Sequence, residues 1–141
     1  MVSIKTYKDS YKADWNNFVD SSKNSTFLFN RDFMDYHSDR FEDFSLMVYE
    51  KSELIALLPL NIIENKVYSH QGLSYGGLIV KNNIKFQKFL ELFIQILKYL
   101  NKKSVDKLFI KQIPLIYNSN FNGELDYLSF MTGCNIYRRD I

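Results

Sequence analysis

The chain has 141 residues, a formal net charge of +2 at pH 7 and 24% charged residues. This length suits one domain with a substantial core, and the balanced charge excludes the clustered basic face that is typical of DNA-binding proteins. Aromatic residues make up 16%, which predicts a well-packed interior and some exposed aromatic surface available for binding.

The cysteine and histidine content and the hydropathy of the chain exclude further classes of protein. The single cysteine, Cys134, cannot form an internal disulfide. Two histidines and one cysteine make a zinc site improbable, so we expect no metal. The N-terminus is too polar for a signal peptide, and no apolar run approaches the roughly 20 residues of a membrane helix. We therefore expect a cytoplasmic domain without a membrane span.

The first elements predicted are a strand and a helix. Ser3–Tyr7 alternates weakly between polar and apolar residues, as a strand does. A helix over Tyr11–Ser22, capped by Asp9 or Ser10, brings Trp15, Phe18 and Val19 onto one face.

A second helix is predicted from Arg31 to about Asp39, with Asn30 as its cap. Its inward-facing residues are expected to be Phe33, Met34 and Tyr36 or His37.

Three strand-like runs follow, separated by short turns. They are Glu42–Glu50, Leu54–Ile63 and a run that starts at Val67-Tyr68, an order that predicts an antiparallel meander. Pro59 cannot donate a hydrogen bond to a ladder, so it marks a bulge, an edge or a break in the second run.

The longest helix is predicted over Ile84–Lys103, followed by a buried strand over Val105–Gln112. Its apolar face is expected to carry Phe86, Phe89, Leu90, Phe93, Ile94, Leu97 and Leu100. A short helix and a last strand, Asn135–Arg139, complete a mixed sheet in an α/β (α+β) domain.

The stretch Ser69-His-Gln-Gly-Leu-Ser-Tyr-Gly-Gly77 is the strongest candidate site. His70 titrates near neutrality and suits a general base, while the alternative is a histidine satisfied by backbone at a strand end. Tyr75 is a phenol donor for a substrate groove that Gly76 and Gly77 leave open, and the alternative is a β-bulge that curves the sheet. Gln71 is expected to line the same site.

Two cations are second-choice binding residues. Arg40, after the second helix, suits bidentate contact with a carboxylate or phosphate, whereas the alternative is a surface ion pair at a helix end. Lys111 ends a buried strand on the side where α/β clefts tend to open, and the alternative is an ordinary strand end.

The element order of one strand, two helices, a meander, a long helix, a strand, a helix and a last strand resembles that of GNAT acyltransferases. Residues Asn24–Ile141 also resemble the first half of the bacterial Fem-related GNAT-like proteins. The similar segments are Ser25-Thr-Phe-Leu, Arg31-Asp-Phe-Met, Tyr36-His-Ser-Asp-Arg-Phe-Glu-Asp-Phe-Ser-Leu46, Ser69–Gly77, Lys111-Gln-Ile-Pro114, Glu124-Leu-Asp-Tyr127 and Tyr137-Arg-Arg-Asp140.

This resemblance implies that residues 1–141 form one GNAT-like domain, the N-terminal half of a longer two-half protein. It implies transfer of an acyl or aminoacyl group to an amine or hydroxyl of a cell-envelope or polysaccharide precursor. The donor in the full protein would be acyl-CoA or an aminoacyl-tRNA, and the partner a second GNAT-like half.

One departure from the family pattern concerns the donor. A GNAT acyl-CoA site needs a Gln/Arg-x-x-Gly-x-Gly/Ala loop that opens the long helix, so that backbone N–H groups hold the pyrophosphate. The corresponding segment, Lys81–Lys85, contains no glycine. We therefore expect no cofactor in this half. The alternative function is a non-catalytic GNAT-like binding domain that lacks its own donor site.

Overall fold

The computed structural model of the chain describes residues 2–22 and 25–111, apart from the side chain of His37. Within them, two four-stranded sheets have the strand orders β1-β3-β4-β7 and β2-β5-β6-β8. The strands are β1 (Val2–Thr6), β2 (Glu42–Asp43), β3 (Leu46–Glu50), β4 (Glu53–Leu58), β5 (Asn61–Ile63), β6 (Lys66–Tyr68), β7 (Ile79–Val80) and β8 (Lys107–Phe109). The α-helices are α1 (Lys12–Ser21), α2 (Arg31–Met34) and α3 (Phe86–Lys102). The predicted helix and strand after Gln112 lie outside the described residues.

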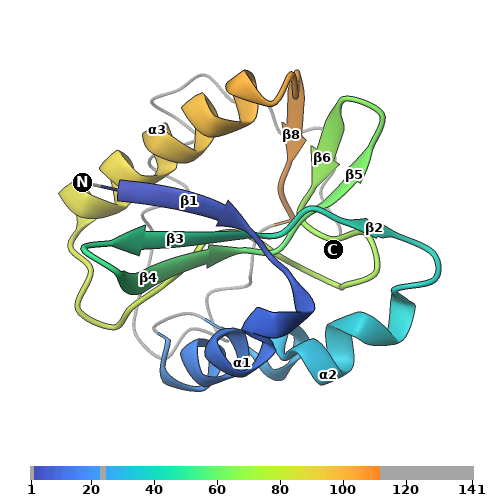
Figure 1. Cartoon of the computed structure of the whole chain (residues 1–141), viewed down its shortest axis with the longest axis horizontal. Coiled ribbons are helices and arrows are strands. Elements are labelled where there is room, and N and C mark those ends of the chain that lie inside the picture. Colours follow the sequence, from blue (N-terminus) through green and yellow to red (C-terminus); the bar gives the residue numbers. More distant parts are fainter. Residues whose placement is uncertain (1, 23–24, 112–141) are drawn as a thin grey trace, which may run out of the picture.

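The helices cover the sheets from opposite sides. Figure 1 shows α3 above the first sheet and α1 with α2 below it. This arrangement confirms the predicted mixed α/β domain for the described residues.

The first sheet is antiparallel throughout. β1 pairs with β3, with Ile4 opposite Val48, and β3 pairs with β4 through a hairpin. Lys51 and Ser52 at its turn have φ of 51° and 68°. Two central residues with positive φ match the right-handed twist of the strands, as in a type I′ turn.

The chain passes between the two sheets between β2 and β3 and again between β4 and β5, and these two crossings lie next to each other. Phe44-Ser45 separates β2 from β3, and Pro59-Leu60 separates β4 from β5. The Ser45 Oγ accepts a hydrogen bond from Leu60 N (3.1 Å) and lies 3.3 Å from Leu60 O. The predicted runs Glu42–Glu50 and Leu54–Ile63 are therefore each divided into two strands, and the two breaks lie next to each other. Of the three alternatives for Pro59, the structure shows the break.

The second sheet is mixed because β8 arrives by a crossover. β5 and β6 are antiparallel neighbours, whereas β6 and β8 are parallel, with Val67 opposite Leu108. A parallel pair needs a long connection, and the segment that contains α3 provides it.

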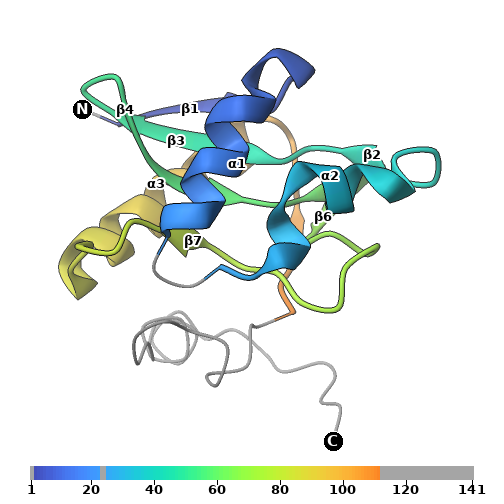
Figure 2. The ribbon, with the colours of Figure 1, turned by 90° about the horizontal axis from the view of Figure 1, so that it is seen from below.

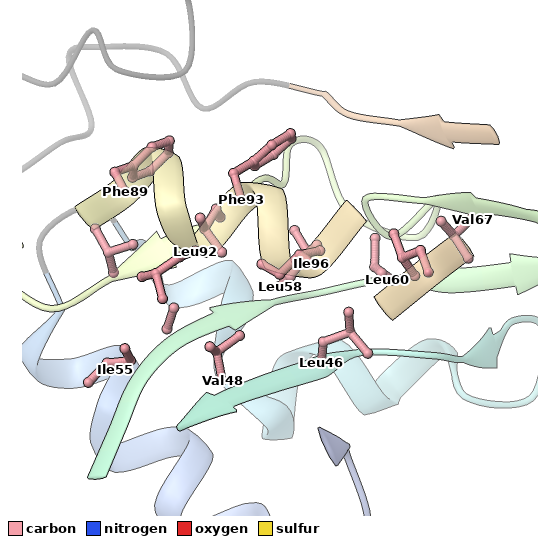
Figure 3. Close-up of a cluster of buried hydrophobic side chains, with 14 of the residues drawn as sticks. Leu46, Val48, Ile55, Leu58, Leu60, Val67, Phe89, Leu92, Phe93 and Ile96 are labelled. Atoms are coloured by element: carbon pink, nitrogen blue, oxygen red, sulfur yellow. The ribbon is translucent and has the colours of Figure 1, made fainter. Parts of the chain in front are cut away.

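One face of α3 forms the main core. Its buried side chains, which belong to one cluster with strand residues, are Phe89, Leu92, Phe93, Ile96 and Leu100. Figure 3 shows Leu92 and Ile96 between the helix and the strands. The predicted helix is confirmed, but the predicted face is wrong in part, since Ile94 is 44% and Leu97 37% exposed. With the angular step of an α-helix, Leu97 lies at the edge of the buried face and Ile94 lies on the opposite side of the helix.

The opposite side of the first sheet is covered by α1 (Figure 2). Trp15, Phe18 and Val19 are buried as predicted. The predicted cap is wrong. Asp9–Tyr11 forms a 3₁₀ turn that leads into the helix, so no side chain caps it.

The second helix is shorter than predicted. The side chain of Asn30 caps it as expected, accepting from Asp32 N at 3.0 Å. The α-helix ends at Met34, and a 3₁₀ turn continues it. Phe33 is 41% and Tyr36 81% exposed, contrary to the predicted inward face. The buried side chains are those of Arg31 and Met34.

A matched pair of substitutions on α3 tests this core assignment. Ile96→Ala removes a fully buried side chain, so we expect the free energy of unfolding to fall by about 2–5 kcal/mol. Ile94→Ala, on the exposed flank, is expected to cost less than about 1 kcal/mol. Urea unfolding of both variants measures the difference. Equal losses would contradict the assignment.

Candidate functional site

The segment from Ser69 to Gly76 leaves the second sheet where β6 and β8 end. Ser69 N donates to Phe109 O at 2.8 Å, and Ser69 Oγ accepts from Lys111 N at 2.7 Å. Gly76 N returns to the same strand end, donating to Lys111 O at 2.6 Å. Both ends of the segment are thus fixed to residues 109–111.

The two adjacent glycines have different roles. A Cβ on Gly76 would lie 2.5 Å from the backbone oxygen of Ser69, so this position needs the close approach that glycine permits. Gly77 has a φ of 115°, which favours glycine for conformational reasons. Both precede β7, outside the strand pairs with a defined register, so the bulge at the glycines stays a prediction.

Gln71 is held from both its backbone and its side chain by one buried residue. Gln71 N donates to Asn61 Oδ1 at 2.6 Å, and Asn61 Nδ2 donates to Gln71 Oε1 at 2.9 Å. Asn61 is fully buried on β5. This two-point contact fixes the residue that follows His70.

A fully buried guanidinium lies beside this segment. Arg31 is the first residue of α2, and its Cζ is 3.5 Å from the ring centroid of Tyr7 and 4.3 Å from that of Trp15. Its Nη1 donates to Asp43 Oδ2 at 2.6 Å and to Asp35 Oδ1 at 3.1 Å. Two carboxylates and two aromatic faces compensate the buried charge.

Asp43 connects this cation to His70. Its Oδ2 is 4.0 Å from His70 Nε2, and its Oδ1 accepts from Ser45 N at 2.8 Å. The His70 side chain is 5% exposed, while that of Asp43 is 32% exposed. The sequence showed no acidic partner for His70, and the fold brings Asp43 to it from β2.

His70 also holds a sharp turn. Its φ is 56°, a left-handed conformation that histidine adopts more readily than most residues. His70 N donates to Tyr68 O at 2.6 Å and its carbonyl accepts from Leu73 N at 2.9 Å. Its ring lies edge-on to Phe41, at 5.9 Å between centroids. The backbone contacts expected under the structural alternative are present, and so is a carboxylate neighbour.

Burial shifts the pKa values of two acidic groups beside Arg31, the Asp35 carboxyl and the Tyr7 phenol. Burial raises the pKa of the Asp35 carboxyl, and the Arg31 guanidinium opposes that rise. Burial likewise raises the pKa of the Tyr7 phenol, again against Arg31. The Arg31 charge therefore limits the rise of the Asp35 pKa without cancelling it.

The remaining predicted residues are spread around this segment. Lys111 Nζ donates to Leu73 O at 3.1 Å, so it braces the segment from the strand end. Arg40 is exposed, with its Cζ 5.8 Å from the centroid of the Phe41 ring, and the same Phe41 ring contacts His70. Tyr75 is half-buried and packs against the cluster that contains Trp15.

The connection between β7 and α3 is fastened to its surroundings. The Lys81 ammonium pairs with Glu53, and Asn82 Nδ2 donates to Ser21 O at 2.9 Å. No acidic residue lies in the first turn of α3, and no side chain caps it. The positive end of the helix suits an anion, but the segment lacks the glycines that a close phosphate contact needs.

Solved structures with this architecture are N-acetyltransferases. The ribosomal-protein-S18-alanine N-acetyltransferase of Escherichia coli aligns with a TM-score of 0.52 and 12% identity. The PaiA N-acetyltransferase of Thermoplasma acidophilum, solved in complex with coenzyme A, aligns with a TM-score of 0.53 and 13% identity. The chain has a GNAT acyltransferase fold.

The extent of these alignments differs. The E. coli alignment covers 77% of this chain and 64% of that protein, and the T. acidophilum alignment covers 94% and 88%. No protein-family model matches the sequence, and no curated protein matches it. At these identities the likeness establishes the GNAT fold of the chain.

The described part of the chain contains no group of three or more histidine, cysteine, aspartate or glutamate side chains arranged to hold a metal ion. None of its helices combines the length and the apolar character needed to cross a membrane.

The residues that sequence reasoning missed are Arg31, Asp43 and Asn61. Arg31 carried a usable signal, since it follows the Asn30 cap at an inward position and has Asp35 one turn later. Asp43 and Asn61 carried none, because both were assigned to uninterrupted strands.

The close approach at Gly76 gives a direct test of this geometry. We expect Gly76→Ala to lower the free energy of unfolding by about 1–3 kcal/mol, because the Ser69 backbone must move. Ser74→Ala, an exposed position in the same segment, serves as the control and is expected within about 0.5 kcal/mol of wild type. Thermal unfolding measures both. A stable Gly76→Ala protein would contradict the geometry.

The raised pKa of Asp35 predicts a pH-dependent stability difference. The folded state binds this proton more tightly than the unfolded state, so its contribution is full below the ordinary carboxyl range. It is lost as pH rises through the raised pKa. We expect the wild-type protein to lose stability relative to Asp35→Asn across that window, measured by urea unfolding at a series of pH values. A difference that does not change with pH would refute it.

Proposed function

We propose that this GNAT domain takes part in acyl transfer to a primary amine or hydroxyl. The observation that carries the proposal is the fold, which two N-acetyltransferases share over 77% and 94% of this chain. The buried His70, with the partly exposed Asp43 carboxylate 4.0 Å from its Nε2, adds a group able to accept a proton next to the end of β6.

His70 is the proposed general base. The acceptor nitrogen or oxygen would form a bond to the acyl carbon, the bond from that carbon to the donor's leaving group would break, and the leaving group would depart with the electron pair. His70 would take the proton that the acceptor loses. Its value as a base depends on an imidazole that is neutral at working pH.

The neighbouring predicted residues have supporting roles in this proposal. Gln71, held by Asn61, and Lys111, held at Leu73 O, keep the segment in place around His70. Gly76 and Gly77 let it return to β7 without steric conflict. Tyr75 is proposed as a phenol donor and Arg40 as a contact for an anionic part of the substrate.

The acyl donor is proposed only by class, as an activated acyl group. The T. acidophilum structure holds coenzyme A, and the uncapped N-terminus of α3 has the right charge for a phosphate. The Lys81–Lys85 connection lacks glycine, which supports a donor site different from the usual pyrophosphate loop.

A narrower proposal rests on the sequence resemblance alone. The Ser69–Gly77 and Lys111–Pro114 segments resemble the Fem-related group, which supports a cell-envelope or polysaccharide precursor as acceptor and acyl-CoA or aminoacyl-tRNA as donor. In that version the chain works as one half with a second GNAT-like half.

The second candidate function is a non-catalytic binding domain with this fold. The fastening of the β7–α3 connection by Lys81 and Asn82 favours it, because those side chains are committed to Glu53 and Ser21 rather than to a donor.

An acyl-transfer assay tests the catalytic proposal. The purified chain is incubated with acetyl-CoA and a panel of primary amines and amino sugars, and free thiol is measured. We expect thiol release with one acceptor class, at least tenfold slower in His70→Gln, since a general base contributes about 10²–10⁴-fold. Lys98→Gln, an exposed change on α3, is the control. Equal rates for both variants would remove His70 from the chemistry.

Binding of the donor separates the two candidate functions. A melting temperature raised by several degrees at millimolar acetyl-CoA is expected for a donor-binding protein and would exclude the non-catalytic reading. An unchanged melting temperature together with no thiol release would favour the binding domain.

A further inference from the structure

We propose that Arg31 is a positioning residue for His70. It holds the Asp43 carboxylate beside the imidazole and offsets its charge, so that the carboxylate favours the imidazolium form less than an unpaired carboxylate would. The role in acyl transfer rests on the proposed function, whereas the coupling of the three side chains is measurable without any reaction.

The contacts of Asp43 show that the carboxylate is already satisfied. Oδ2 accepts from Arg31 Nη1 at 2.6 Å, and Oδ1 accepts from Ser45 N at 2.8 Å, with Arg31 Nη2 at 3.4 Å. His70 Nε2, at 4.0 Å from Oδ2, lies outside hydrogen-bond distance. The carboxylate therefore faces the ring, but its strong hydrogen bonds go to Arg31 and to backbone.

Arg31 is itself held rigidly. Its side chain is fully buried against the rings of Tyr7 and Trp15, and its backbone N donates to Asn16 Oδ1 at 2.7 Å. Trp15 is in turn fixed by the hydrogen bond from its Nε1 to Phe29 O at 2.7 Å. A guanidinium held on three sides fixes the position of Asp43 more tightly than a flexible surface cation would.

The charges around His70 give the sign of the effect. A bare carboxylate within about 4–6 Å favours the protonated imidazole and raises its pKa. Arg31, bound to the same carboxylate, opposes that attraction. Asp35 shares Arg31 Nη1 and so weakens this opposing effect.

Other charged groups near His70 remain constant across the variants. On the loop before β2, the Arg40 Cζ lies 5.8 Å from the centroid of the Phe41 ring. On the strand end, Lys111 Nζ is bound to Leu73 O. On β1, the Tyr7 phenol stays neutral because its pKa is raised by burial. Differences between variants therefore report the Arg31–Asp43 pair.

The test is an NMR pH titration of the His70 ring, assigned with His70→Gln. We expect Arg31→Gln to raise the pKa of His70 by about one unit or more and Asp43→Asn to lower it. Arg31→Lys keeps the charge and is expected to stay nearer to wild type than Arg31→Gln. An unchanged or lowered pKa in Arg31→Gln overturns the proposal.

Removing Arg31 leaves two partly buried carboxylates uncompensated and can prevent folding. A second variant therefore tests the proposal with Arg31 in place. Asp35→Asn releases Arg31 Nη1 for Asp43 and is expected to lower the pKa of His70. The matched control is Asp32→Asn, which removes an equal charge from the adjoining helix α2, where the Asp32 side chain is 71% exposed and paired with Lys12. Equal shifts in Asp35→Asn and Asp32→Asn would also overturn the proposal.

The readouts separate this inference from the proposed function. The predicted pKa shifts without thiol release from any acceptor would support the coupling and contradict acyl transfer. Thiol release that depends on His70, with no pKa shift in Arg31→Gln, would support acyl transfer and contradict the role of Arg31.

Discussion

The burial of one positive charge organises the side of the molecule that faces α1 and α2. Arg31 is fully buried, and a lone buried charge is strongly destabilising unless it is paired and hydrogen-bonded. Its partners come from four parts of the chain: Tyr7 after β1, Trp15 on α1, Asp35 after α2 and Asp43 on β2. Each of these elements is therefore fixed relative to the others through the same guanidinium.

The break between the two sheets connects this cluster to the candidate site. Ser45 and Leu60 bond to each other where both strands change sheets. The change leaves Asp43 and Asn61 side by side in the second sheet, as the β2–β5 register shows. Asp43 then faces His70, and Asn61 holds Gln71. Two adjacent polar side chains on short strands thus position two consecutive residues of the Ser69–Gly77 segment.

Periodicity predicted most of the described fold because it reports which face of an element is buried. α3, the face of α1 and the strand pairs of the meander follow from it. It was wrong for α2, where the apolar Phe33 and Tyr36 point outward and a charged residue points inward. A pattern based on hydropathy cannot place a buried arginine inside, since the residues that compensate its charge are distant in sequence.

For the described residues the sequence by itself predicted a strand, two helices, a meander, the long helix and a further strand, because glycine and proline constraints and helical spacing act locally. It selected Ser69–Gly77 as the candidate site. It also limited Gly76-Gly77 to close approach or positive φ. Only the tertiary structure decided that Gly76 has the first role and Gly77 the second. It alone paired His70 with Asp43 and both with Arg31. Those contacts join segments whose proximity depends on where two strands leave their sheet, and no local preference specifies that point.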